Sequence, residues 1–247
     1  MIAVVGMGQL GTLLSERARA AGQDVVELRR GQRVQGELER VLVTVGEDDL
    51  SPVLASLPER VRDRVVLVQN ELVPDQWRAH GITRPTVAVV WFEKKKDKPA
   101  RVVLPTPIAG PWAAPLVAML EDAKLDATVI DEALLPSALL DKNVYILVSN
   151  IAGLAAPPGT TTSELLELER LETTTRVFAD VLEVESRRLA LPIDADMAAA
   201  AMMRAFLADP THVAAGRSAP LRLSRTLERA ERLDLKVEAL RAITKKS

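Results

Sequence analysis

The chain contains no cysteine, so disulfide bonds, thiolate nucleophiles and thiolate metal sites are all excluded. Its two imidazoles, His80 and His212, are too few for a histidine-rich metal centre, and we assign neither of them a function. Aromatic residues make up only 3% of the sequence, which disfavours stacking platforms for single-stranded nucleic acid. The sequence therefore predicts no metal site and no binding of nucleic acid through stacked bases.

Charge and hydropathy exclude two further classes of partner. With 32 Lys and Arg against 34 Asp and Glu, the net charge is −2, so no strong field attracts the molecule to nucleic acid or to an anionic membrane. The first residues, Met1 to Gly6, enter a strand-like run at once, without the basic flank and long apolar segment of a signal peptide or membrane anchor. We expect a cytoplasmic protein with no membrane partner and no nucleic-acid partner.

The first half of the sequence alternates β-branched runs with helical stretches, which is typical of a parallel sheet covered by helices. The runs are continuous rather than alternating, as in strands buried on both faces. Prolines between residues 105 and 115 predict a break in regular structure. The expected strands are 2–5, 25–28, 41–45, 65–68, 86–92, 101–104 and an edge strand at 127–130, and the expected helices are 10–21, 50–57 and 116–123; a lysine-rich turn at 93–99 joins two of the strands.

From Glu132 onward the strand signals vanish and leucines recur at helical spacing between Leu165 and Leu189. The pattern Thr161-x-x-Glu164 predicts a capping box that starts this long helix, and Asp194 is the expected cap of the next one. The predicted fold class is therefore α/β plus all-α, with a Rossmann-type dinucleotide-binding domain over 1–131 and a helical domain over 132–247.

One motif carries most of the chemical information. Gly6-Met7-Gly8-Gln9-Leu10-Gly11 follows a predicted strand and opens a helix, which is the context of a dinucleotide-binding turn. The first glycine permits the tight turn, the second lets the main chain approach a diphosphate, and the third allows the helix to pack closely against the strand. We expect these six residues to bind the cofactor, because free N–H groups at the start of the helix face its phosphates. A turn without a ligand, or one that binds S-adenosylmethionine, is the alternative.

The end of the second strand selects between NAD and NADP. Glu27 stands where an acidic residue would bind the ribose 2′-hydroxyl of NAD, but Arg29, Arg30 and Arg33 follow it directly. A 2′-phosphate gains more from a bidentate guanidinium than a hydroxyl gains from a carboxylate. The sequence thus favours NADP(H) bound by Arg29 and Arg30, although a basic surface loop would have the same composition.

Several short segments, taken in order, resemble the ketopantoate reductase family over most of the chain. They include a strand that ends in Gln69-Asn70, where Glu71 stands in place of the family's glycine, and the start of a helix at Asp141-Lys142. The other segments that carry the resemblance are Leu42-Val43-Thr44-Val45, Thr86 to Phe92, Arg101 to Leu104, Ile108-Ala109-Gly110, and Asn150 with Leu154.

The resemblance implies a reductase that transfers hydride from NADPH to the carbonyl of a small 2-oxo acid. It places Lys142 as the proton donor, since an ammonium polarises a carbonyl and can protonate the product alkoxide. Asn150, eight residues later on the same helix face, is the second predicted catalytic residue. A surface lysine and an asparagine bonded to the backbone near Gly153 are the structural alternatives.

Three further residues receive roles through the resemblance. Asn70, at the carboxyl end of its strand, is expected to contact the cofactor, with a turn-stabilising role as the alternative. Ser218 is expected to bind the substrate carboxylate, with a helix N-cap as the alternative and with Arg217 or Arg222 adding charge. Glu228 is the candidate for the family's glutamate that binds the substrate hydroxyl.

Two departures from the family leave a second function open. Ile146 stands where the family has an asparagine, and the C-terminal part is shortened around the family's glutamate. These changes favour either a less polar 2-oxo acid or related carbonyl substrate, or an inactive NADP(H)-binding sensor or assembly protein. Met202 and Met203 in an alanine-rich helix favour a close helix contact, within one chain or between the copies of a homodimer.

Overall fold

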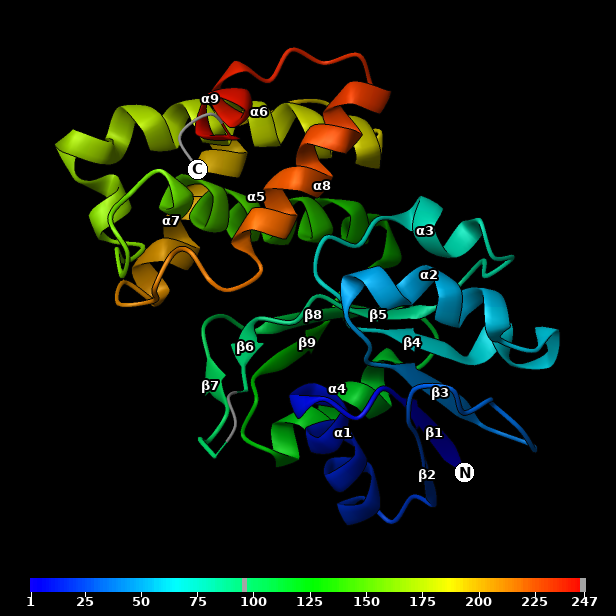
Figure 1. Ribbon diagram of the computed structural model, residues 1–247. Coiled ribbons are helices and arrows are strands. Elements are labelled where there is room, and N and C mark those ends of the chain that lie inside the picture. Colours follow the sequence, from blue (N-terminus) through cyan, green and yellow to red (C-terminus); the bar gives the residue numbers. More distant parts are fainter. Residues whose placement is uncertain (95–96, 245–247) are drawn as a thin grey trace. The chain divides into compact units, whose positions relative to one another are not determined.

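The structure, a computed structural model, describes residues 1–94 and 97–244 (Figure 1). The chain divides into two compact units, Met1–Leu139 and Leu140–Ser247. This division lies within the continuous helix α5, Leu135–Leu154, whereas the sequence pattern places the boundary after residue 131, where the strand signals end. Lys95 and Lys96 of the predicted lysine-rich turn lie outside the described residues.

The first unit is built on a seven-stranded sheet with the order β2-β1-β3-β4-β5-β8-β9. All neighbouring strands are parallel except β5 and β8, which are antiparallel. The strands of this sheet are β1 Ile2–Val5, β2 Val25–Leu28, β3 Arg40–Val43, β4 Val65–Leu67, β5 Thr86–Ala88, β8 Thr106–Ala109 and β9 Ala127–Val129. The central strands are buried on both faces, as their continuous β-branched runs predict.

Helices cover both faces of this sheet (Figure 1). α1 and α4 pack on one face, where Leu14, Leu116 and Leu120 join β-strand residues in one apolar core, while α2 and α3 lie on the other face. The helices and 3-10 turns of this unit are α1 Gln9–Ala20, α2 Glu47–Ser56, η1 Glu59–Arg64, α3 Pro74–Arg78, α4 Ala113–Asp122 and η2 Glu132–Leu134.

The strand register brings three chain segments to the same edge of the sheet. Val5 at the end of β1 is level with Leu28 on β2 and with Val43 on β3. The residues that follow these strands therefore emerge side by side at their carboxyl ends, which is where open α/β sheets bind ligands. These residues begin the glycine turn, the arginine-rich loop and the segment that leads into α2.

The region around the prolines differs from the sequence prediction in two ways. The strand expected over 86–92 is interrupted, because only β5 joins the main sheet and a separate β6, Phe92–Glu93, pairs with β7, Arg101–Val102. The break expected between 105 and 115 is wrong for its first residues, which form β8. Pro107 is accommodated there because its carbonyl still accepts a hydrogen bond from Val89 N–H at 2.9 Å, so only the donor is lost.

The second unit is helical, and apart from an isolated bridge between Thr161 and Val213 the described residues beyond β9 form no strand. Its long helix α6 buries Val177, Val181 and Leu182 as the apolar stripe predicts. The helices of this unit after α5 are η3 Glu164–Leu166, α6 Leu168–Leu189, α7 Ala195–Ala208, α8 Ala219–Arg232 and α9 Glu238–Thr244.

The start of α6 differs from the prediction. The capping box does form, since Thr161 N–H donates to Glu164 Oε2 at 2.7 Å, but it lies at the entry to the 3-10 turn η3, whose N-cap residue is Ser163, rather than at the start of the long helix. α6 begins only at Leu168, whose side chain is 91% exposed and therefore does not belong to the buried stripe. Asp194 caps α7 as expected, by accepting from Met197 N–H at 3.0 Å.

Candidate functional site

Of the three glycines in the turn between β1 and α1, two are required by close packing and the third faces open space. Gly6 has a φ of +99°, and a Cβ there would lie 2.7 Å from Cγ1 of Val45. A Cβ on Gly11 would lie 2.6 Å from Oγ1 of Thr44. At Gly8, by contrast, no atom of the described residues lies within 4 Å of the Cβ position. The packing of the protein itself therefore requires glycine at 6 and 11, while Gly8 leaves bare main chain exposed to a ligand.

The start of α1 adds favourable electrostatics to this turn. Gly8 is the N-cap residue, and the first turn of α1, which is fully described, carries no acidic side chain. The first N–H groups of a helix have no partner within the helix, and the helix dipole places partial positive charge there. An anion beside Gly8 would meet these N–H groups directly.

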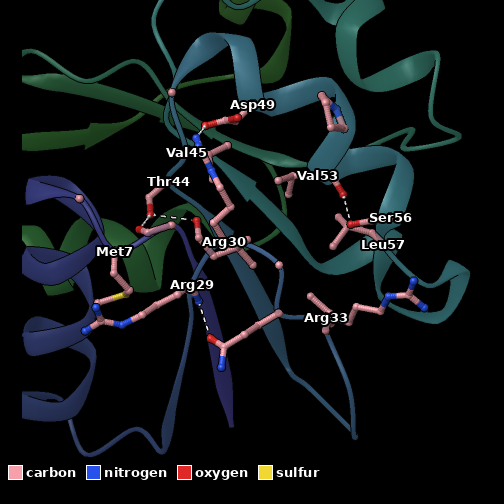
Figure 2. Close-up of a pocket in the computed structure, with 18 residues that line it drawn as sticks. Met7, Arg29, Arg30, Arg33, Thr44, Val45, Asp49, Val53, Ser56 and Leu57 are labelled. Carbon is pink, nitrogen blue, oxygen red and sulfur yellow. Dashed lines mark hydrogen bonds and ion pairs between the residues drawn. The ribbon is translucent and has the colours of Figure 1, made fainter.

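A cavity of about 700 Å³ opens at this edge of the sheet (Figure 2). Its walls are the glycine turn, the arginine-rich loop, the end of β3 and one face of α2. The face of α2 contributes an apolar wall made of Pro52 and Val53, continued by Leu57. The cavity combines bare main chain, cationic side chains and an apolar wall, which suits a ligand with phosphates and a flat ring.

The arginine-rich loop is held in shape by hydrogen bonds between Arg29 and Gln32. Arg29 N–H donates to Gln32 Oε1 at 2.6 Å, the Gln32 N–H donates back to the Arg29 carbonyl at 3.0 Å, and Gly31 has a φ of +85°. Arg29 and Arg33 line opposite sides of the cavity, and Arg30 reaches α2, where its Nη2 lies 2.6 Å from Asp49 Oδ2 (Figure 2). The loop thus presents guanidinium groups where β2 ends.

Glu27, the residue that would favour NAD, is engaged elsewhere. Its Oε1 accepts hydrogen bonds from Ser15 Oγ at 2.7 Å and from Arg19 Nη1 at 2.6 Å, both on α1. These two hydrogen bonds lower the pKa of the Glu27 carboxyl below its ordinary value, so it stays ionised and paired. The side chain does not line the cavity within the described part of the chain.

The turn that follows β4 contains a residue whose only signal in the sequence is a departure from the ketopantoate reductase pattern. Glu71 has a left-handed φ of +58° and is fully buried, in the place of the family's glycine. A non-glycine residue in this conformation costs about 1 to 3 kcal/mol, and such strain and buried carboxylates concentrate at functional sites. Next to it, Asn70 is half-buried, and the buried Gln69 donates from Nε2 to the Val43 carbonyl at 2.6 Å.

In the second unit, α5 carries Lys142 and Asn150 on one face. Lys142 is buried to 9% exposure, and its Nζ lies 5.2 Å from the centre of the Tyr145 ring. Half-buried Ile146 lies between Lys142 and Asn150 along the helix. Beside Lys142, burial raises the pKa of the Asp141 carboxyl from 3.8 to about 6.

Asn150 is buried, and both polar atoms of its side-chain amide form hydrogen bonds. Its Nδ2 donates to the Ile146 carbonyl at 2.9 Å, and its Oδ1 accepts from Arg222 Nη1 on α8 at 2.9 Å. The bond to the Ile146 carbonyl agrees with the alternative of a buried asparagine bonded to the backbone, although the carbonyl lies one turn before Asn150 and not near Gly153. The bond to Arg222 joins α5 to the start of α8 and brings this arginine, named in the sequence only as a source of charge, next to a predicted catalytic residue.

The two predicted substrate-binding residues lie on α8. Ser218 occupies the N-cap position and is exposed, and its side chain makes no capping hydrogen bond in the described structure. Glu228 is exposed and forms an ion pair with Arg232 at 3.6 Å. The structure therefore gathers Gly6, Met7, Gly8, Arg29 and Arg30 around one cavity in the first unit, and it places Lys142, Asn150, Ser218 and Glu228 on two helices of the second.

Two other kinds of feature are absent from the described residues, a metal-binding cluster and a membrane-spanning helix. Across residues 1–94 and 97–244, no cluster of three or more His, Asp or Glu side chains is arranged to hold a metal ion. Among the residues that the structure describes, no helix is both long enough and apolar enough to cross a bilayer.

Comparison with known proteins identifies the fold through solved structures. No protein-family model matches the sequence, and no curated protein sequence matches it. Solved structures do match over nearly the whole chain. A PanE/ApbA family ketopantoate reductase from Ralstonia eutropha JMP134 is 18% identical with a TM-score of 0.69, the match covering 98% of this chain and 96% of that one. The chain has the ketopantoate reductase fold.

Two further structures with this fold extend the comparison. A dimeric ketopantoate reductase from Staphylococcus aureus is 15% identical with a TM-score of 0.66, over 98% of this chain and 97% of that one. D-mandelate dehydrogenase, solved with NADH, is 10% identical with a TM-score of 0.68, over 99% of this chain and 96% of that one. The ketopantoate reductase fold, a dinucleotide-binding domain followed by a helical domain, confirms the fold class expected from the sequence.

Proposed function

We propose that this protein is an NADPH-dependent reductase of a small 2-oxo acid. The observation that carries the proposal is the turn at Gly8, where bare main chain at the start of α1 opens onto the cavity. A diphosphate fits this cradle because a Cβ is absent and unpartnered N–H groups are present. D-mandelate dehydrogenase has the same fold and was solved with NADH, which supports a nicotinamide dinucleotide as the ligand.

The arginine-rich loop supports NADPH over NADH. Arg29 and Arg30 lie at the end of β2, where the adenosine ribose of a dinucleotide sits in this type of domain. Glu27 is bound to Ser15 and Arg19, so it does not compete for the ribose hydroxyls. We infer that the guanidinium groups of Arg29 and Arg30 bind the 2′-phosphate.

The residues of the second unit would supply the proton for the reaction. The cofactor, when bound, supplies a hydride to the carbonyl carbon and is oxidised to NADP⁺. Lys142 donates a hydrogen bond to the carbonyl oxygen and then transfers a proton to it, so that the C=O bond becomes CH–OH and the neutral amine is reprotonated from water. Asn150 is the second residue of this helix face, and Ser218 and Glu228 are the proposed substrate contacts on α8.

The residue at 146 supports an apolar substrate. An asparagine there would offer hydrogen bonds to a substrate hydroxyl, whereas Ile146 offers only hydrocarbon. A site lacking one buried polar partner changes its selectivity by orders of magnitude. D-mandelate dehydrogenase, whose name denotes an aromatic 2-hydroxy acid, shares this fold. We propose 2-oxo acids with an apolar side chain, such as phenylglyoxylate and 2-oxoisovalerate, as substrates.

Cofactor binding and turnover can be tested together. NADPH is titrated by fluorescence, and its oxidation is followed with a panel of 2-oxo acids. Lys142→Ala should lower kcat by at least about 100-fold and leave the Kd for NADPH unchanged, because general acid catalysis contributes that much. Lys236→Ala, which removes an exposed lysine from the same unit, is the matched control and should keep full activity.

A second candidate function is an NADPH-binding sensor without turnover. The engaged amide of Asn150 and the apolar Ile146 both favour it, because each removes a polar contact to substrate. Tight NADPH binding with no oxidation by any carbonyl compound would support the sensor. Stabilisation by S-adenosylmethionine but not by NADPH would overturn both candidates.

A homodimer is also part of the proposal. It is supported by the dimeric Staphylococcus aureus ketopantoate reductase, which has this fold. Sedimentation tests it, because a homodimer has twice the mass of the single chain.

A further inference from the structure

The cavity beside the glycine turn contains a carboxylate among its cationic side chains. Arg29, Arg30 and Arg33 line it, and among the residues that the structure describes Asp49 of α2 is the only acidic one on its walls. A site for a phosphorylated nucleotide gains from guanidinium groups and loses from a carboxylate, because like charges repel. The presence of Asp49 on this wall is therefore unexpected for a site that binds an anion.

The helix dipole explains why acidic residues occupy the first turn of α2 but not where the Asp49 side chain points. Glu47, Asp48 and Asp49 all lie in that turn, where partial positive charge stabilises a carboxylate. The Asp49 carboxylate also pairs with the loop that follows β2, since Arg30 Nη2 lies 2.6 Å from its Oδ2. This ion pair joins two walls of the cavity, 19 residues apart in the sequence (Figure 2). Asp49 thus binds one of the predicted cofactor contacts.

The ion pair holds Arg30 only weakly. The Arg30 side chain is 86% exposed and that of Asp49 is 48% exposed, and an exposed ion pair contributes at most about a fivefold factor to an equilibrium constant. The backbone of the loop is fixed separately, by the hydrogen bonds between Arg29 and Gln32. A change of rotamer therefore turns the Arg30 guanidinium group without moving the loop.

The two arginines predicted to bind the 2′-phosphate point away from each other. Figure 2 shows Arg29 extending to the side of the cavity where Met7 lies, while Arg30 extends to Asp49. A phosphate bound by both guanidinium groups requires that of Arg30 to turn back from α2, so the phosphate and the Asp49 carboxylate compete for one cation. The phosphate is the stronger ligand, because it carries a charge of about −1.5 to −2 at pH 7 and three acceptor oxygens.

We propose that Asp49 is a specificity-determining residue that competes with the 2′-phosphate of NADPH for Arg30. The inference rests on the proposed function, since it concerns the choice between NADPH and NADH at the same site. In the structure the Asp49 carboxylate occupies the guanidinium group that the phosphate would take. NADPH has to displace this carboxylate and NADH does not. Asp49 therefore lowers the affinity for NADPH alone and reduces the preference for NADPH over NADH.

The test measures the Kd values of NADPH and NADH by calorimetry for the full-length wild type and its variants. Asp49→Asn, which keeps the size of the side chain and removes its charge, should tighten NADPH by about 3- to 5-fold and change NADH by less than about 1.5-fold. Asp75→Asn is the matched control, because it removes a carboxylate from the first turn of α3 that pairs with Arg78 at 3.9 Å, and it should change neither Kd. Unchanged or weaker NADPH binding in Asp49→Asn would overturn the proposal.

Arg30→Ala tests whether Asp49 acts through Arg30. In this background Asp49→Asn should change the Kd of NADPH by less than about 1.5-fold, because no guanidinium group is left to compete for. The same gain with and without Arg30 would show that the carboxylate repels the phosphate from a distance, and it would overturn the competition. A purely structural effect of losing a carboxylate from the first turn of α2 would alter the Kd values of NADPH and NADH alike, so their ratio separates it from the proposed role.

A second pair of ligands separates this inference from the proposed function. Adenosine 2′,5′-bisphosphate and 5′-AMP differ only in the 2′-phosphate, and neither carries a nicotinamide. Tighter binding of the bisphosphate, but not of 5′-AMP, to Asp49→Asn than to the wild type would support the inference even if no 2-oxo acid is reduced. Equal Kd values of the bisphosphate for both proteins would contradict it even if NADPH-dependent reduction is observed. Circular dichroism shows that each variant is folded, and Asp49→Ala replaces Asp49→Asn if the latter is not.

Discussion

Substitutions at Gly8 and at Gly11 should affect different properties, NADPH binding at Gly8 and the free energy of unfolding at Gly11. A Cβ at Gly8 meets no described atom within 4 Å, and the backbone there has φ −80° and ψ −167°, which any residue adopts. Gly8→Ala and Gly8→Val should therefore change the free energy of unfolding by no more than about 1 kcal/mol, the range of N-cap and glycine effects. The added carbon atoms would instead occupy the space of the diphosphate.

The expected loss of binding can be worked out from the close approach that Gly8 allows. If the diphosphate rests on the main chain at Gly8, valine should weaken NADPH by at least about 100-fold, or about 2.8 kcal/mol, and alanine by less. Saturation of the wild type at 100 times its Kd stabilises it by about 2.7 kcal/mol, and most of this gain should disappear in Gly8→Val. Calorimetric titration and denaturant unfolding with and without NADPH measure both quantities.

Gly11→Ala is the matched control. Its Cβ would lie 2.6 Å from Thr44 Oγ1, and Thr44 is itself fixed by hydrogen bonds to the carbonyls of Val5 and Gly6. We expect Gly11→Ala to be destabilised without ligand by about 1 to 3 kcal/mol, the usual cost of overpacking. Wild-type NADPH affinity in Gly8→Val would refute the assignment of the turn as the phosphate site.

Three other predictions concern cofactor choice, pH and the buried ion pair. Replacing Arg29 and Arg30 by Ala should weaken NADPH by about 10- to 100-fold and NADH by less than about threefold; equal losses for both nucleotides, measured by calorimetry, would argue against a 2′-phosphate contact. Because burial raises the pKa of Asp141 to about 6 from 3.8, the folded state holds its proton more tightly, so stability should fall as pH rises from 4 to 6. Asp141→Asn should remove this loss and gain about 1 to 2 kcal/mol at pH 7.5, after allowance for its partial exposure, and urea unfolding at pH 4.5 and 7.5 tests it; a difference between wild type and variant that does not change with pH would count against this account. Glu185→Leu should destabilise by about 3 to 5 kcal/mol because it leaves the Arg188 charge buried without its carboxylate, and a loss below about 1 kcal/mol would show that this carboxylate is dispensable.

Local patterns made much of the first unit predictable. The continuous apolar runs correctly predict the central strands, and the glycine motif lies between β1 and α1 as expected. Glycine is required at position 6 by its positive φ and at position 11 by the close approach of Thr44. The strand β8 was missed, because the rule that proline disrupts strands does not show that Pro107 loses only its donor while its carbonyl still bonds Val89.

Contacts between distant residues could not be predicted. Arg222 reaches Asn150 across 72 residues of sequence, and nothing in the local pattern indicates that pairing. The left-handed backbone of the buried Glu71 was equally hidden, since the only signal was a glutamate where a related family has glycine. The capping box at Thr161 was recognised correctly as a motif, but sequence alone did not show that the chain turns again before α6 begins at Leu168.

The most direct test of the account is a crystal structure of the protein soaked with NADPH. We expect the diphosphate to lie against the main chain of Gly6 to Gly8, with the 2′-phosphate between the guanidinium groups of Arg29 and Arg30. A cavity that stays empty at saturating NADPH, or a nucleotide bound away from this turn, would contradict the central claim.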